Sequence, residues 1–268
     1  MESSTIHLTQ WSRHGAADPR VVLVHGGAQG SETGGDRYFS AQSRLATRGW
    51  SVVAPDRPGH GRSPSPGRPD DAEADGLWVA ELLGEGAHLV GPSFGGSVAL
   101  AAATARPEAV RSLTLIEPAM HALGVTNPRV REFLGSMMAV HAGSPSAAEV
   151  AQRFMKVVSV PEEIAGSRGP EVLERMGEGI RRMKLPSPDW LRVSLAALGA
   201  RGIPTLVVTG GWSPAFEAVG DVVAALSGGE RAVTPSKHHH PQLVGDAFNM
   251  RLANFMSAAD TRAATAKS

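Results

Sequence analysis

Short runs with the composition of buried strands recur along the chain, and helical patterns separate them. The runs are residues 21–24, 51–54, 88–90, 111–116, 204–209 and 231–235. Most of them are continuous apolar stretches, which is typical of strands covered on both faces in a parallel sheet. Apolar residues at helical spacing lie between them, in residues 38–48, 72–83, 99–105, 216–226 and 241–256. This alternation predicts an α/β fold with a doubly wound, mainly parallel sheet, which binds ligands at the carboxyl ends of its strands.

The alternation stops after residue 118. Residues 119–202 form several helical pieces broken by proline and glycine, with no strand-like run among them. They follow a strand of the sheet, so we expect them to lie over its carboxyl edge as a helical cap. The sequence thus predicts a core made of residues 1–118 and 203–258, a cap made of residues 119–202, and a disordered tail over residues 259–268.

One turn in this pattern carries a chemical signal. After the strand at 88–90 the chain reads Gly-Pro-Ser-Phe-Gly, and an alanine-rich helix follows. A serine at such a strand-to-helix turn is held in a strained backbone conformation, and the small residues Gly91 and Gly95 let the strand and helix approach closely. The hydroxyl of Ser93 is then presented at the carboxyl end of a strand, beside the N–H groups that open a helix.

With these elements placed, the chain resembles the α/β-hydrolase superfamily, and within it a capped esterase or lactonase with a serine nucleophile. The resemblance covers nearly the whole chain, and its motifs occur in the family's order. They are His-Gly-Gly at 25–27, Asp-Arg-Pro-Gly-His-Gly-Arg-Ser at 56–63, Gly-Pro-Ser-Phe-Gly-Gly at 91–96 and a late histidine before the last helix. The family's usual cap follows its sixth strand, which is where we expect the helical insertion.

The resemblance implies that Ser93 is a nucleophile and that His239 is its base. The family's histidine commonly lies two residues before a proline at the start of the last helix, and His239 has that spacing. The usual acid position, after the seventh strand, holds Ser213 instead. Glu117, at the end of the sixth strand, is the favoured acid because a buried strand end is a poor place for an idle charge. The alternatives are that Glu117 is only held by nearby backbone N–H groups, or that Glu217 is the acid.

Two backbone N–H groups are expected to form an oxyanion hole, those of Phe94 and Gly27, with Ala28 as an alternative donor. We place Ala28 among the substrate-binding residues for this reason. Six of the nine methionines fall in the predicted cap, and flexible thioethers suit an adaptable apolar pocket. Met137 and Met138 are the candidates from the cap, and Trp212 is a further candidate for the pocket wall. These residues predict a small, largely apolar substrate.

The remaining histidines and the second motif have structural interpretations. The imidazole of His25 is expected to tie down its loop, and Asp56, Arg57 and His60 resemble the family's structural turn. Three consecutive histidines at 238–240 also suggest metal binding, but adjacent side chains point in different directions and rarely share one ion. The sequence therefore predicts no metal site and no cofactor.

Composition narrows the classes of partner. The chain has 26 basic and 26 acidic residues, so no net charge favours nucleic acid or an anionic membrane. It has no cysteine, which excludes disulfides, thiolate catalysis and cysteine-bound zinc. The first residues lack the pattern of a signal peptide, and no apolar run reaches membrane-spanning length. We expect a cytoplasmic protein with a small-molecule substrate, and a homodimer is left open.

Three functions are compatible with this pattern. The first is a serine hydrolase that cleaves an ester, lactone or related carbonyl bond through an acyl-enzyme. The second is a dioxygenase without cofactor, a lyase or a carbon–carbon hydrolase that uses His239 as a base, because the same scaffold supports other chemistry. The third is a ligand-binding protein with a decayed site, which Ser213 at the usual acid position slightly favours. A haloalkane dehalogenase would need a carboxylate in place of Ser93.

Overall fold

The fold is built on one mainly parallel sheet. A computed structural model describes residues 6–13, 19–27, 38–160 and 168–265, and within them seven strands pair in the order β1-β3-β2-β4-β5-β6-β7. Only β1 runs antiparallel to its neighbour. The strands are β1 (Leu8–Trp11), β2 (Arg20–Leu23), β3 (Ser51–Pro55), β4 (Ala87–Pro92), β5 (Val110–Ile116), β6 (Thr205–Thr209) and β7 (Glu230–Val233). The predicted α/β class and parallel sheet are confirmed, while the edge strand β1 is an addition to the prediction.

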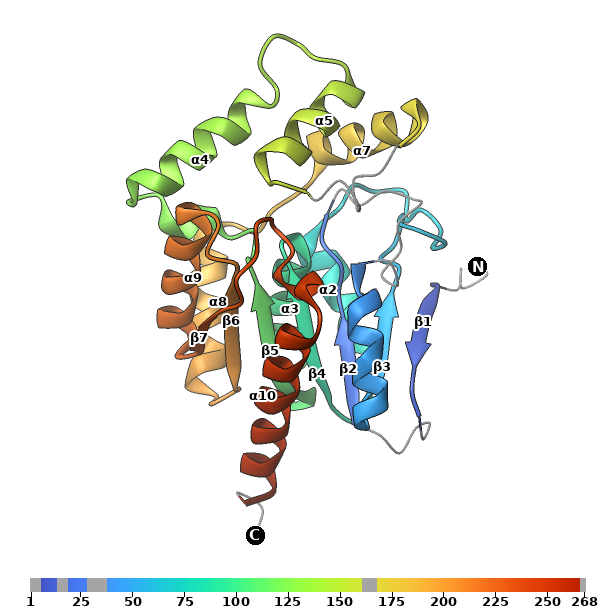
Figure 1. Ribbon diagram of the computed structural model, residues 1–268, viewed down its shortest axis with the longest axis vertical. Helices are drawn as coiled ribbons and strands as arrows, with labels where there is room; N and C mark the ends of the chain where they lie inside the picture. Colours follow the sequence, from blue (N-terminus) through green and yellow to red (C-terminus); the bar gives the residue numbers. More distant parts are fainter. Residues whose placement is uncertain (1–5, 14–18, 28–37, 161–167, 266–268) are drawn as a thin grey trace.

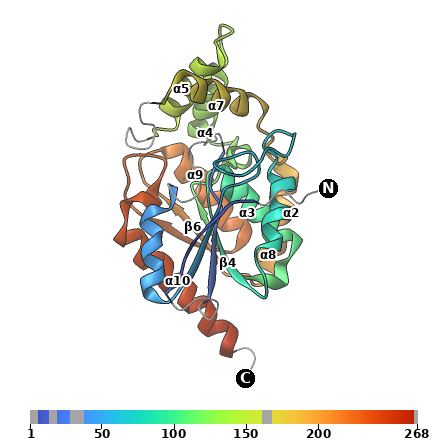
Figure 2. The same cartoon turned by 90° about the vertical axis from the view of Figure 1, so that its right-hand side faces the viewer.

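Helices cover both faces of the sheet, as a doubly wound fold requires. One face carries α2 (Ala72–Glu81), α3 (Phe94–Ala105), α8 (Pro188–Ala200) and α9 (Pro214–Ser227). The other face carries the 3₁₀ helix η2 (Ser40–Arg48) and α10 (Asp246–Thr265). Figure 2 shows α10 on one side of the sheet and α2, α3 and α8 on the other. Apolar side chains of the strands point alternately into these two layers, so the central strands β2, β4 and β5 are buried throughout most of their length.

The inserted helices follow β5. They are α4 (Pro128–Ala139), α5 (Ala147–Val157) and α7 (Pro170–Arg182), and Figure 1 shows them above the carboxyl ends of the strands. A short 3₁₀ helix, η4 (His121–Gly124), leads from β5 into α4. Lys184, which follows α7, forms a 2.7 Å ion pair with Asp71 at the start of α2 and so ties the insert to the core. Within the described residues the insertion follows β5, the strand that ends just before Glu117, which the family's order numbers as the sixth.

The C-terminal boundary of the insert differs from the expectation. Helix α8 lies within the predicted cap of residues 119–202, but it packs against α3 and α9 on the flank of the sheet. Its residues Leu191, Leu195 and Leu198 are buried in the same core as those helices. Proline at its first turn and the side chain of Ser187, which accepts from the N–H of Trp190, start this helix afresh after the insert. The helices above the sheet therefore end before residue 188.

The C-terminal helix is longer than the sequence pattern predicted. We expected disorder from residue 259, but α10 continues to Thr265. Ala259 is buried, and Asp260 forms an ion pair with Arg111 at 3.2 Å and a hydrogen bond with His88 at 3.3 Å. These tertiary contacts stabilise a stretch whose polar, alanine-rich composition gave no sign of them. The predicted tail is thus wrong as far as Thr265.

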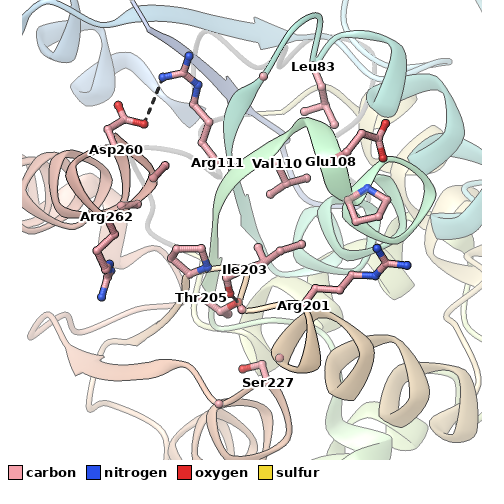
Figure 3. Close-up of a pocket in the computed structure, with 18 of the residues that line it drawn as sticks. Leu83, Glu108, Val110, Arg111, Arg201, Ile203, Thr205, Ser227, Asp260 and Arg262 are labelled. Atoms are coloured by element: carbon pink, nitrogen blue, oxygen red, sulfur yellow. Dashed lines mark hydrogen bonds and ion pairs between the residues drawn. The ribbon is translucent and has the colours of Figure 1, made fainter. Parts of the chain in front are cut away.

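One large groove lies at the amino ends of the strands. It measures about 1860 Å³ and includes residues from the starts of β2, β5, β6 and β7. Figure 3 shows its charged side chains, with Arg111 paired to Asp260. Ligands of open α/β sheets bind at the opposite edge, beyond the carboxyl ends of the strands. No helix among the described residues is both long and apolar enough to cross a bilayer.

Candidate active site

Ser93 stands at the carboxyl end of β4, on the first turn of α3. Its backbone φ of 53° lies in the left-handed region that side chains other than glycine rarely adopt. The turn closes tightly, because a Cβ at Gly91 would clash with the carbonyl oxygen of Gly95, and one at Gly95 would clash with that of Val24. These contacts explain why glycine occupies both positions around Ser93. The residue is half-buried while its neighbours are buried, so the turn presents its side chain outward from the sheet.

Glu117 lies directly after β5 and has a second unusual backbone conformation, with a φ of 40°. Its side chain is 1% exposed. The carboxylate accepts the backbone N–H of Gly210 at 2.8 Å and the indole N–H of Trp212 at 2.9 Å, both on Oε1. A buried carboxylate needs several donors, and these two come from the loop after β6. The loop thus fixes the carboxylate in one orientation.

His239 completes this cluster. Its Nδ1 atom lies 2.7 Å from Oε2 of Glu117, a distance typical of a charge-assisted hydrogen bond. Its imidazole stacks on the ring of Phe216, with centroids 4.4 Å apart and an interplanar angle of 29°. The side chain is 5% exposed. Glu117 and Phe216 together set the position and tilt of the His239 ring.

The backbone brings Ser93 and Glu117 to the same edge of the sheet. The N–H of Ser93 donates to Ile116 at 2.9 Å, and the carbonyl of Ser93 accepts from Ala119 at 3.1 Å. These bonds bracket Glu117 in the sequence, so adjacent parallel strands place the serine turn and the carboxylate side by side. Of the residues that the sequence singled out, Glu117 and His239 are hydrogen-bonded, and the backbone of Ser93 lies beside Glu117 at the same edge.

The other acid candidates are used elsewhere. Glu217 accepts from Thr209 at 2.8 Å and from the backbone of Gly211 at 2.9 Å, and it forms a 2.6 Å ion pair with Arg231. Ser213 caps α9 through its backbone, because its carbonyl accepts from the N–H of Glu217. Glu117, in contrast, forms a hydrogen bond with His239.

The loop after β2 meets the serine turn. A Cβ added to Gly27 would lie 3.1 Å from the Cβ of Phe94 and would clash with the thioether of Met183. The two residues predicted to donate N–H groups, Gly27 and Phe94, are therefore neighbours, and Met183 lies over the first of them. Phe94 also opens α3, where free N–H groups and the helix dipole favour negative charge. Ala28 lies outside the described residues.

Family comparison agrees with this architecture. A family model described as the alpha/beta hydrolase fold matches residues 19–155, just over half of the chain. The chain belongs to the α/β-hydrolase family. Several of its curated relatives are hydrolases by name, among them a lipase and two hydrolases that act on 2-hydroxy-6-oxononadienedioate and on 2-hydroxymuconate semialdehyde.

This chain matches two curated relatives over different shares of their length. It is 42% identical to the lipase LipV of Mycobacterium tuberculosis over 134 residues, which is 47% of each chain. It is 34% identical to a 2-hydroxymuconate semialdehyde hydrolase of Pseudomonas sp. strain CF600 over 215 residues, 73% of this chain and 70% of that protein. This chain thus spans about half the length, or slightly less, of the first curated relatives that it matches. Among solved structures, the enol-lactonase of Burkholderia xenovorans LB400 has a TM-score of 0.66 at 17% identity, covering 94% of this chain and 96% of its own, which shows the fold.

A buried ionic cluster holds the loop that contains Gly27. The guanidinium of Arg57 donates to the carbonyls of His25 at 3.1 Å and Gly26 at 2.9 Å, and it pairs with Asp75 at 2.5 Å and Asp70 at 3.2 Å. Burial, followed by the nearby charge of Arg57, lowers the pKa of His25 well below its ordinary value. The predicted structural role of His25 and Arg57 matches these contacts.

The predicted pocket residues have mixed outcomes. Met138 is 72% exposed, which corrects its assignment to a pocket, because the side chain points to solvent from the outer face of α4. Met137 is half-buried and shares the inner face of α4 with Val130 and Phe133. Trp212 uses its indole N–H on Glu117 and lies beside Phe216, with ring centroids 5.5 Å apart.

Sequence reasoning missed two aromatic neighbours of the site, Phe216 and His121. Phe216 lies in the first turn of α9, just beyond the carboxyl end of β6, and this position at the ligand edge is the one signal that could have found it. His121 lies in η4, four residues after Glu117. Among the three consecutive histidines, the ring of His240 lies near those of His239 and His238, with centroids 5.5 and 6.3 Å away, while His238 contacts Ser236 and His240 contacts Gln242. The described residues hold no group of three or more side chains that could bind a metal.

Proposed function

We propose that this α/β hydrolase uses Ser93 as a nucleophile to cleave an ester, lactone or related carbonyl bond through an acyl-enzyme. His239 accepts the serine proton through Nε2 while Oγ forms a bond to the carbonyl carbon, and the imidazolium then returns the proton to the departing alkoxide. In the second half, His239 takes a proton from water while the water oxygen bonds to the acyl carbon, the bond from that carbon to Ser93 Oγ breaks, and the imidazolium returns the proton to Oγ.

The observation that carries this proposal is the 2.7 Å hydrogen bond between His239 Nδ1 and Glu117 Oε2. When Nδ1 donates its hydrogen to the carboxylate, the Nε2 atom keeps its lone pair and is available as a base. Within the described residues, Glu117 forms no ion pair with lysine or arginine, so its negative charge is left for the imidazolium. This arrangement supports Glu117 as the acid of the triad.

The developing oxyanion would be stabilised by backbone N–H groups. The N–H of Phe94 opens α3, and Gly27 brings a second backbone segment beside it. Donors that are fixed before the reaction stabilise the transition state without reorganisation, and losing one costs about 10²- to 10³-fold in rate. The Arg57 contacts to the carbonyls of His25 and Gly26 support this role by holding the loop in place.

The surroundings support a small and largely apolar substrate. Phe216 stacks on His239, and the ring of Phe133 in α4 has its centroid 5.3 Å from that of Phe216. Met183 lies over Gly27. These side chains give the site apolar and polarisable walls contributed partly by the inserted helices. We propose a small molecule as the partner of the site.

Hydrolysis of a carbon–carbon bond is the second candidate. It is favoured by the 2-hydroxymuconate semialdehyde hydrolase of strain CF600, which matches 73% of this chain at 34% identity. In that case the bond between the acyl carbon and the neighbouring carbon breaks. The neighbouring carbon leaves as a carbanion, and it receives the proton that an alkoxide would receive in ester cleavage. Ser93, His239 and Glu117 would keep their roles.

A substrate panel tests the proposal. Purified protein would be assayed with 4-nitrophenyl esters of increasing acyl length, an aromatic lactone and 2-hydroxymuconate semialdehyde, followed by intact mass after an acid quench. We expect turnover of at least one ester or lactone and a protein mass increased by the acyl group. Ser93→Ala should abolish both signals, while Ser97→Ala, in the same helix, should retain them. Turnover that survives in Ser93→Ala would contradict the proposal, and cleavage of the semialdehyde alone would select the second candidate.

A further inference from the structure

The Nε2 atom of His121 is buried and has no hydrogen-bond partner within the described part of the chain. Buried polar atoms are nearly always paired, so each exception calls for a physical explanation. The other such atoms belong to Gln42, Ser97, Thr114, Thr234 and Gln242. His121 differs from them because its ring belongs to a row of aromatic rings that ends at His239.

This row crosses from the inserted helices to the proposed base. The imidazole of His121 stacks on the ring of Phe133 in α4, with centroids 4.4 Å apart. It meets the ring of Phe216 in α9 edge-on, with centroids 4.7 Å apart. Phe216 in turn stacks on His239 at 4.4 Å. His121 therefore lies two ring contacts from His239, on the side where the insert faces the core.

The ring of His121 is neutral under ordinary conditions. Burial, and secondly the charge of His239, lowers its pKa to about 3. A neutral imidazole has one N–H donor and one acceptor lone pair, so it recognises an uncharged polar group. It also does not compete with His239 for the proton of the nucleophile.

We propose that His121 determines specificity by hydrogen-bonding an uncharged oxygen of the substrate, several bonds from the scissile carbonyl. The preferred substrates are then largely apolar molecules that carry one ketone, hydroxyl or ether oxygen at that distance. This inference rests on the proposed function, because it places the scissile carbonyl at Ser93.

A packing role alone does not explain this residue. Phenylalanine would fill the space between Phe133 and Phe216 with no unpaired nitrogen, and it would avoid the cost of burying a polar atom. A ligand oxygen would satisfy Nε2 only in the complex. A site built to bond such a group discriminates against analogues that lack it, because its own polar atom is then left unpaired.

Matched pairs of esters test the proposal. The acyl pairs are 4-nitrophenyl 5-oxohexanoate with hexanoate, and 4-hydroxyphenylacetate with phenylacetate, so that either tautomer of His121 meets a partner. The alcohol pair is 2-methoxyethyl hexanoate with butyl hexanoate. In at least one pair, wild type should prefer the oxygen-bearing ester, and His121→Phe should reduce that ratio of kcat/KM by about threefold to tenfold, the range of one neutral hydrogen bond.

Two control variants separate recognition from packing. Phe133→Leu changes the same aromatic row without removing the nitrogen, so it should change both members of a pair equally. His121→Gln keeps a donor and an acceptor, and it should restore part of the preference if His121→Phe fails to fold. Equal effects of His121→Phe on both esters of every pair, or no preference in wild type, would overturn the proposal.

A binding readout separates this inference from the proposed function. In ¹⁵N-histidine-labelled Ser93→Ala protein, the NMR signal of His121 Nε2 should move with the oxygen-bearing ester and not with its partner. If no ester is hydrolysed by wild type but this shift occurs, the proposed function fails and the role of His121 stands. If esters are hydrolysed and no oxygen-bearing ester moves the signal, the role of His121 fails alone.

Discussion

Two clusters of histidine and carboxylate lie at the carboxyl edge of the sheet, and they differ in how the carboxylates are balanced. In the Glu117 cluster, the carboxylate meets His239, Trp212 and the backbone of Gly210. In the Arg57 cluster, Asp70 and Asp75 meet a buried guanidinium, and His60 lies 3.3 Å from Asp70. Both clusters are almost completely buried, and both follow a strand of the sheet.

The two clusters differ in whether the carboxylate already has a permanently charged partner. Arg57 carries a permanent positive charge, and Arg68 adds a second one 2.6 Å from Asp75, so the two aspartates are already compensated. Glu117 has only neutral donors and an imidazole that becomes positive when it accepts a proton. The first arrangement stabilises a loop, whereas the second stabilises a charge that appears during a reaction.

The largest effect that sharpens this comparison is expected for Glu117→Gln. The amide keeps the shape but loses the charge and can favour the wrong tautomer of His239, so kcat/KM should fall by about 10⁴-fold. Glu217→Gln is the matched control, because Glu217 pairs with Arg231 and not with His239, and it should lower kcat/KM by less than about tenfold. Steady-state kinetics on the best substrate checks both values. Similar losses in the two variants would contradict the assignment.

Arg57→Met should lower the free energy of unfolding. It removes the buried guanidinium that Asp70 and Asp75 share, and breaking a buried ion pair in this way costs about 3–5 kcal/mol. Urea unfolding measures this loss. Arg44→Met removes an exposed ion pair with Asp246 and should cost about 1 kcal/mol or less. A fully stable Arg57→Met protein would show that the cluster is not what holds the loop.

Acid should weaken the Arg57 cluster through Asp70. Burial raises the pKa of Asp70, but the charge of Arg57 and a hydrogen bond from His60 outweigh burial and hold that pKa well below its ordinary value. The folded state therefore binds this proton less readily than the unfolded state. The resulting stability is present above about pH 4 and is lost as the pH falls below it, by an amount of about 2 kcal/mol. Unfolding between pH 3 and 6 should show a smaller slope in Asp70→Asn than in wild type, and an equal slope would contradict this account.

The smallest expected effect concerns Phe216. Its ring stacks on His239, and an aromatic face stabilises the imidazolium that forms in the transition state by about 0.5–1 kcal/mol. Phe216→Leu should therefore lower kcat by about two- to fivefold, as measured under substrate saturation. Phe133→Leu offers a comparison, since Phe133 contacts Phe216 and His121, and it should leave kcat within about twofold. An unchanged kcat in Phe216→Leu would remove this ring from the account.

The features that were predicted from sequence are those with a local signature. Buried strands are short apolar runs, and the turn at Ser93 is a five-residue pattern between a strand and a helix. The pairing of His239 with Glu117 joins residues 122 positions apart, and the order of motifs in the resembled family was needed to propose it.

The features that were missed depend on contacts between distant segments. The aromatic row joins η4, α4 and α9, and no periodicity in any one of them indicates that Phe133, His121 and Phe216 meet. The end of α10 is stabilised by Asp260 pairing with Arg111, and α8 returns to the flank of the sheet although it follows the insert directly. Tertiary packing decides these cases, and composition does not reveal it.

The measurement that tests the central claim most directly is labelling by a fluorophosphonate, followed by intact mass. The reagent forms a bond between Ser93 Oγ and phosphorus and expels fluoride, which requires an activated serine but no knowledge of the substrate. The account predicts one adduct in wild type and in Glu217→Gln, none in Ser93→Ala, and strongly slowed labelling in His239→Ala and Glu117→Gln. Labelling that is absent from wild type, or undiminished in Glu117→Gln, would contradict the claim that Glu117 and His239 activate Ser93.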